Sequence, residues 1–189
     1  ISVLAFVNIL YSSYFDYFLS IDSYVVTLVI SFVIGLSLLF LGKKSQKKIN
    51  FIEQLVLIIS VYLLISFFIS LPFYLSNYQV TFLNSLFESI SGITGTGFSI
   101  FSDIKYLDPT LILWRSSAQW IGGLYFLFFL IFIFSNKQFD FKMNNLTYSG
   151  DGNINSVSNI KDFLLKIFII YSVLTLIIFL LLNITEVRL

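Results

Sequence analysis

The chain has 189 residues, of which 58% are hydrophobic and 11% are charged, and its mean hydropathy is +0.94. Because soluble domains carry about 25% charged residues, this composition predicts an integral membrane protein. The sequence has no cysteine and no histidine, and its net charge is +1, which excludes disulfides, zinc-type sites and histidine catalysis and offers no basic excess for nucleic acid.

A transmembrane helix needs about 20 mostly apolar residues. Residues 1–19 are apolar but interrupted by polar side chains, and we interpret them as the outer part of a truncated span. Full spans are predicted at residues 24–41, 51–71, 112–134 and 163–182. The chain begins at Ile1 and its only methionine is Met143, so we expect a fragment, and its start lacks the features of a signal peptide.

The placement of charged residues predicts the orientation of these spans. Lysines follow the first full span and recur in the connection 135–162, so both places should be cytoplasmic. The connections 12–23 and 72–111 are acidic, with Lys105 as their only base, and should face outward. Four alternating crossings place every connection on the side that its charges favour.

The segment between the second and third spans should therefore leave and re-enter the same, outer side. Apolar side chains recur there at helical spacing: Phe82, Leu83, Leu86, Phe87, Ile90 and Ile93. A helix over residues 83–93 would be about 16 Å long, roughly half of a hydrocarbon core of about 30 Å. The sequence thus predicts an all-α membrane protein with a helix–re-entrant pore loop–helix repeat.

A run of small, polar and glycine residues, 91–99, follows this half-helix. Rings of backbone carbonyls can replace the water of a potassium ion. Gly95 and Gly97 permit the unusual backbone angles that such carbonyls need, and the hydroxyls of Thr94 and Thr96 can brace the loop or add ligands. The C-terminal end of the half-helix also favours a cation. The alternative is an ordinary extracellular turn.

Two motifs resemble a known family. The first motif is NSLFESISGITGTG at 84–97, which is similar to the first pore loop of the Trk/Ktr/HKT potassium transporters. The second is LWRSSAQWIGG at 113–123, which is similar to the membrane span that follows this loop in the same family. The TrkH-like membrane subunit is the most similar type, and the resemblance covers roughly residues 20–183.

The resemblance implies a chain of four membrane–pore–membrane repeats around a central ion path. Residues 1–50 would be the remains of a preceding helix pair, 51–137 the first repeat, and 138–189 a cytoplasmic linker with the first helix of the second repeat. The architecture would therefore be potassium-channel-like but incomplete, and this chain would supply one loop in four.

The resemblance also implies the site. The main-chain oxygens of Thr94, Gly95, Thr96 and Gly97 would bind K⁺, which is the transported ion rather than a cofactor. Gly95 departs from the family pattern, where we expect threonine, which puts the selectivity of this loop in question.

Three further residues are candidates for supporting the loop: Glu88, Arg115 and Gln119. Glu88 would anchor the pore helix or concentrate cations at the mouth. Arg115 would pair with Glu88, Asp103 or Asp108, or extend its head group to the membrane surface. Gln119 would hydrogen-bond the loop.

Other polar and small residues have structural interpretations. Asp103 and Asp108 are interpreted as solvated loop acids, and the two tryptophans as interface and packing residues. Gly122 and Gly123 should permit close helix packing. The polar stretch 144–159 would be a flexible linker or a contact for a regulatory subunit.

The sequence as a whole predicts a potassium uptake protein of the bacterial cytoplasmic (inner) membrane. The resemblance implies a homodimer in membrane lipid, with a cytoplasmic nucleotide-binding regulatory subunit and no nucleic acid. The alternative is a secondary transporter with broken helices around an organic anion or Na⁺. An enzyme is not expected, because the chain lacks His, Cys and paired intramembrane carboxylates.

Overall fold

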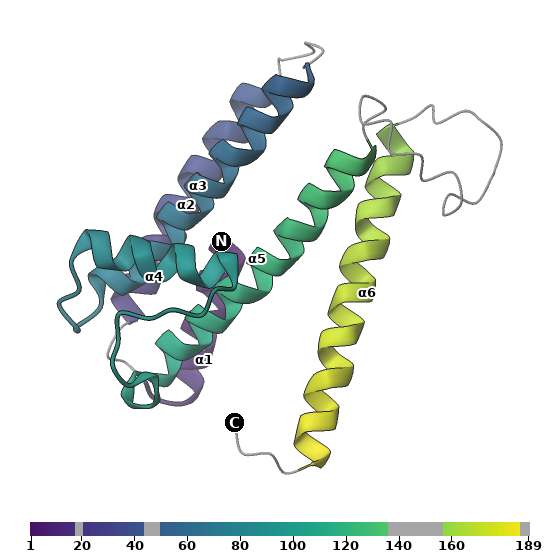
Figure 1. The fold of residues 1–189 in the computed structure, drawn as a ribbon. Coiled ribbons are helices and arrows are strands. Elements are labelled where there is room, and N and C mark those ends of the chain that lie inside the picture. The colour runs from purple at the N-terminus through teal and green to yellow at the C-terminus, as the bar shows by residue number, and fades with distance from the viewer. Residues whose placement is uncertain (18–20, 44–49, 136–156, 186–189) are drawn as a thin grey trace. The chain divides into compact units, whose positions relative to one another are not determined.

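The computed structural model describes residues 1–17, 21–43, 50–135 and 157–185, and every regular element in these ranges is helical (Figure 1). They form two compact units, Ile1–Gly123 and Leu124–Leu189, and α5 runs from the first into the second. The elements are α1 (Ser2–Tyr14), α2 (Ile21–Gly42), α3 (Phe51–Leu75), α4 (Phe82–Thr94), the short 3-10 helix η1 (Ile104–Tyr106), α5 (Pro109–Ser135) and α6 (Val157–Ile184).

Three helical stretches among the described residues are long and apolar enough to cross a membrane: Ile21–Gly42, Ile52–Leu75 and Leu164–Ile184. They coincide with three of the four predicted spans and confirm an all-α integral membrane protein. The remaining predicted span, residues 112–134, lies inside α5, which is helical over 27 residues. Its crossing of the membrane, the orientation of the spans and the predicted domain limits stay predictions.

The ends of α3 follow from its terminal residues. The backbone N–H of Asn50 donates to Glu53 Oε2 at 3.0 Å, which is half of a capping box. At the other end the helix continues through Pro72 to Leu75, beyond the predicted end at residue 71. Proline costs one helical hydrogen bond, but Pro72 and Phe73 are both fully buried, and that burial offsets the loss.

Trp114 of α5 is the centre of the core of the first unit. Its side chain is buried, and its indole Nε1–H donates to the carbonyl oxygen of Ile69 in α3 at 3.0 Å. Its ring lies 5.6 Å from that of Tyr24 in α2, whose hydroxyl group is 3.3 Å from Thr110 Oγ1. One side chain thus joins three helices, which confirms the packing interpretation for this tryptophan.

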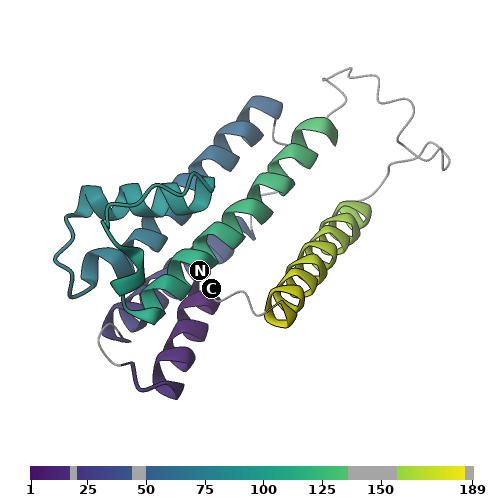
Figure 2. The same cartoon turned by 60° about the horizontal axis from the view of Figure 1, so that its bottom comes forward.

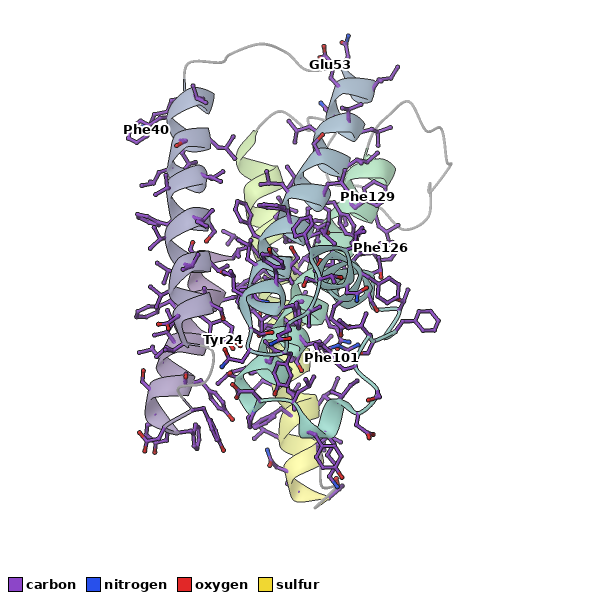
Figure 3. All side chains as sticks on the ribbon, turned by 90° about the vertical axis from the view of Figure 1, so that its left-hand side faces the viewer. Tyr24, Phe40, Glu53, Phe101, Phe126 and Phe129 are labelled. Atoms are coloured by element: carbon purple, nitrogen blue, oxygen red, sulfur yellow. The ribbon has the colours of Figure 1, made fainter. Side chains whose placement is uncertain are left out.

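Small and polar side chains are among the buried residues of α1 and α2. They include Asn8 and Ser12 of α1 and Thr27 and Ser31 of α2. Figure 3 shows Tyr24 directed toward the neighbouring helices and Phe40 projecting away from them. This pattern is typical of membrane helices, in which small and polar residues face the protein and apolar residues face the apolar lipid.

The second unit contains the end of α5 and all of α6. The apolar window of α6 has none of its residues buried. Such a continuous exposed apolar surface is expected where a helix meets lipid or further protein.

Candidate ion-binding loop

The half-helix α4 lies across the long helices of the first unit rather than along them (Figures 1 and 2). It covers Phe82–Thr94, one residue longer at each end than predicted. Thr81 caps its start, where Thr81 Oγ1 accepts a hydrogen bond from the backbone of Asn84 at 3.4 Å. Gly95 ends it in the left-handed conformation, with φ of 70°.

The buried face of α4 is its polar face. Ser85, Glu88 and Ser89 are fully buried, whereas Leu83 and Phe87 are exposed. A soluble protein would place these side chains the other way round. The small serines let α4 approach its neighbours closely, and the apolar residues are left for lipid or for further protein.

The loop after α4 has exposed residues from Thr94 to Phe98. Gly95 and Gly97 both have positive φ, 70° and 79°, which confirms that the loop uses the backbone freedom of glycine at these positions. The chain then runs back alongside α4 to the start of α5, as the ribbon in Figure 2 shows.

Three hydroxyl groups join the loop to the end of α4. Ser91 Oγ donates to the carbonyl oxygen of Phe98 at 2.6 Å and lies 3.1 Å from Thr96 Oγ1. Thr94 Oγ1 lies 3.2 Å from Thr96 Oγ1 and donates to the carbonyl oxygen of Ile90 at 2.8 Å. The threonine hydroxyls therefore brace the loop against α4.

A buried ion pair between α4 and α5 lies next to the loop. Arg115 Nε of α5 lies 2.5 Å from Glu88 Oε1, with side chains that are 10% and 0% exposed. The same carboxylate accepts hydrogen bonds from Ser99 Oγ at 3.1 Å and from the backbone N–H of Ile100 at 2.9 Å. These donors satisfy a buried charge that would otherwise be costly. The predicted pairing of Arg115 is confirmed, with Glu88 as its partner.

The outer nitrogen of Arg115 also contacts the loop backbone. Nη2 donates to the carbonyl oxygen of Gly97 at 3.2 Å and to that of Phe98 at 3.1 Å. Of the described residues, none donates a hydrogen bond to the carbonyl oxygens of 94–96. The backbone oxygens of the loop are thus divided between a stretch held by arginine and a stretch open to a ligand.

The helix α5 lies against the end of α4 through small residues. A Cβ at Gly122 would lie 1.9 Å from the carbonyl oxygen of Ile93, and one at Gly92 would lie 3.3 Å from Ala118 Cβ. Close packing is therefore confirmed for Gly122. The third support candidate, Gln119, is half-buried, and its side chain makes no hydrogen bond to any described residue.

The interpretation of Asp108 as a solvated acid is wrong. Asp108 is buried, and its Oδ1 accepts from the backbone N–H of Thr110 at 3.1 Å, so it caps the start of α5. Its own N–H donates to the hydroxyl oxygen of Tyr78 at 2.8 Å. The sequence signal was present, because aspartate before Pro109 is a typical helix start. Asp103 is exposed, as expected.

Sequence reasoning assigned no role to Ser91 or Ser99, whose hydroxyl groups hold the two ends of the loop. Of the predicted linker 144–159, residues 144–156 lie outside the described residues. Within the described ranges, no group of three or more His, Cys, Asp or Glu side chains is placed to hold a metal ion.

Comparison with known proteins identifies the family. A family model described as TrkH, cation transport protein, matches residues 21–188. The chain is 32% identical over 106 residues to the Trk system potassium uptake protein TrkG of Escherichia coli. The aligned stretch covers 56% of this chain and 22% of that protein. It is 47% identical over 60 residues to the Trk system potassium uptake protein TrkI of Halomonas elongata, which covers 32% and 12%.

A third relative is an uncharacterised cation transporter of Methanocaldococcus jannaschii, 35% identical over 63 residues, which covers 33% of this chain and 13% of that protein. The matched part of the chain spans about a fifth or less of the length of these relatives, and no solved structure matches the chain. A family of transporters also agrees with the expectation that the chain is not an enzyme. Because the family model covers most of its length, the chain belongs to the TrkH family of cation transport proteins.

Proposed function

We propose that this chain supplies one of the potassium-selecting loops of a K⁺ uptake protein in the bacterial cytoplasmic membrane. The ligands would be the main-chain oxygens of Thr94, Gly95, Thr96 and Gly97. The observation that carries the proposal is a loop with exposed backbone, two left-handed glycines and carbonyl oxygens at 94–96 without a donor among the described residues. Two relatives named as potassium uptake proteins support potassium as the ion.

The direction of α4 supports a cation rather than an anion. Its C-terminal end adjoins the loop, and a helix C-terminus carries about half a negative charge. The rival secondary transporter for an organic anion would need a helix N-terminus at its site. No observation on the loop favours that rival.

The assembly is part of the proposal. One loop cannot surround an ion, so the remaining loops must come from other segments or chains. The exposed apolar faces of α4 and α6 suit contacts with them and with lipid. A homodimer and a cytoplasmic nucleotide-binding regulatory subunit complete the proposed arrangement.

Rb⁺ uptake by the reconstituted full-length protein tests the proposal. Gly97 has φ of 79° with open space around its Cβ position, so Gly97→Ser adds backbone strain without a clash. We expect this variant to lower uptake of K⁺ and Rb⁺ relative to Na⁺. An unchanged ion preference in a folded Gly97→Ser protein would reject the filter assignment. Gly35→Ser, in α2 with nothing near its Cβ position, is the matched control.

A further inference from the structure

Asn8 of α1 carries a buried acceptor oxygen that no described group of the chain satisfies. The side chain is fully buried, and its Nδ2 donates to the carbonyl oxygen of Leu4 at 3.0 Å. Because only the amide nitrogen can donate to that carbonyl, Oδ1 lies on the opposite side of the amide group. Among the described residues, Asn8 Oδ1 is the one buried side-chain oxygen or nitrogen without a hydrogen-bond partner. Such a group is costly inside a protein, so it indicates a ligand that donates a hydrogen bond.

The hairpin of α1 and α2 brings Thr27 to the level of Asn8. The two helices pack against each other and run in opposite directions (Figures 1 and 2). Asn8 lies six residues before the end of α1 at Tyr14, and Thr27 lies six residues after the start of α2 at Ile21. Both side chains are fully buried. We therefore expect the two polar groups to lie across the hairpin from each other.

The hydroxyl group of Thr27 can accept a hydrogen bond but cannot donate one to Asn8. Its single hydrogen is already used, because Thr27 Oγ1 donates to the carbonyl oxygen of Ser23 at 2.7 Å. The hydroxyl group of Ser31, one turn further along α2, is used in the same way by the carbonyl oxygen of Leu28 at 3.2 Å. A hydroxyl oxygen keeps lone pairs when its hydrogen is donated. Asn8 and Thr27 thus present two acceptors, and a ligand between them needs two donors.

We propose that a water molecule binds between α1 and α2 and donates one hydrogen bond to Asn8 Oδ1 and the other to Thr27 Oγ1. Buried waters typically make about three hydrogen bonds to polar groups that would otherwise be unpaired. A cation is the poorer ligand, because α1 has no charged residue and the one charged residue of α2, Asp22, is exposed. A buried charge without a counter-charge is costly, whereas water is neutral.

The water is a structural ligand that is separate from the ion path. In lipid, apolar contacts do not drive helices together, so hydrogen bonds between helices contribute to their association. Ala5, one turn before Asn8, belongs to the same buried cluster as Tyr24 of α2 and Trp114 of α5. The bridge therefore holds α1 against the core of the first unit, and the inference does not depend on the proposed function.

A cryo-EM structure of the full-length protein in lipid nanodiscs, at a resolution that shows ordered waters, tests the proposal. We expect a density about 3 Å from both Asn8 Oδ1 and Thr27 Oγ1, unchanged when choline replaces K⁺ and Na⁺ in the buffer. No density at this place overturns the proposal. So does a density that disappears in choline, which would be a cation, or a side chain from another part of the protein that donates to Oδ1.

A double-mutant cycle tests the bridge through thermal unfolding of the full-length protein. Asn8→Leu and Thr27→Val each break the same bridge, so the second change costs less after the first. We expect the double variant to melt about 3 °C higher than the sum of the two single shifts predicts. Additive shifts overturn the bridge.

Ser37→Ala combined with Asn8→Leu is the matched control. Ser37 is exposed in α2 and donates to the carbonyl oxygen of Val33 in its own helix at 2.8 Å, so the shifts of this pair should add. If Asn8→Leu does not fold, the cryo-EM density in Thr27→Val decides. We expect that density to be weaker than in wild type, and an unchanged density would overturn the bridge to Thr27.

Discussion

The backbone of Gly122 in α5 lies against the carbonyl group of Ile93 at the end of α4, so close that a Cβ at Gly122 would lie 1.9 Å from the Ile93 oxygen and 2.7 Å from its Cα. Real Cβ atoms do not approach so near, so one helix would have to move. This contact fixes the end of α4, from which the loop begins.

Gly122→Ala should therefore destabilise the protein by about 1–3 kcal/mol, because overpacking against backbone cannot be relieved by a side-chain rotation. Thermal unfolding in detergent, followed by circular dichroism, measures the change. Gly35→Ala in α2 meets open space and should be neutral or slightly stabilising. A Gly122→Ala protein as stable as wild type would contradict the close approach.

Glu88→Gln should cost about 3–5 kcal/mol, because it leaves the guanidinium of Arg115 buried without a counter-charge. The double variant Glu88→Gln with Arg115→Gln should lose less than the single variant, since no charge is then left unpaired. Both are measured by thermal unfolding. Glu53→Gln changes an exposed acid at the start of α3 and should cost less than about 1 kcal/mol. Equal stability of Glu88→Gln and wild type would argue against the ion pair.

Ser91→Ala should lower both stability and ion uptake. It removes the hydroxyl group that bonds the Phe98 oxygen and Thr96 Oγ1, at a cost of about 1–2 kcal/mol. Ser89→Ala is a close control, because Ser89 is also buried in α4 but bonds the Leu86 oxygen of its own helix. If the two variants transport Rb⁺ equally well, Ser91 does not brace the loop.

Asp108→Ala should destabilise the protein by about 0.5–2 kcal/mol through loss of the cap of α5. Asp108→Asn keeps an acceptor oxygen and should restore most of the stability. Asp103→Ala changes an exposed acid without a side-chain capping bond and should stay within about 0.5 kcal/mol of wild type. Chemical or thermal unfolding of the three variants side by side checks the order.

Predictions from the sequence were best where they depended on local patterns. The half-helix was predicted at 83–93 and is found at Phe82–Thr94, because helical periodicity and a following glycine are local signals. The span predicted to end at residue 71 continues as helix to Leu75, where Phe73 is buried by residues distant in the sequence. Asp108 was misread although its capping signal was local.

The sequence by itself determined that the chain is an all-helical membrane protein, and it located a glycine-containing loop after a half-length helix, because composition and periodicity are written in neighbouring residues. It allowed three acids as partners of Arg115. Only the tertiary structure shows that the partner of Arg115 is Glu88, 27 residues away in the sequence. It also shows that the guanidinium donates to the oxygens of Gly97 and Phe98. The physical reason is that a buried charge takes whichever partners the packing of α4 against α5 brings within hydrogen-bond distance, and that packing depends on the close contact at Gly122.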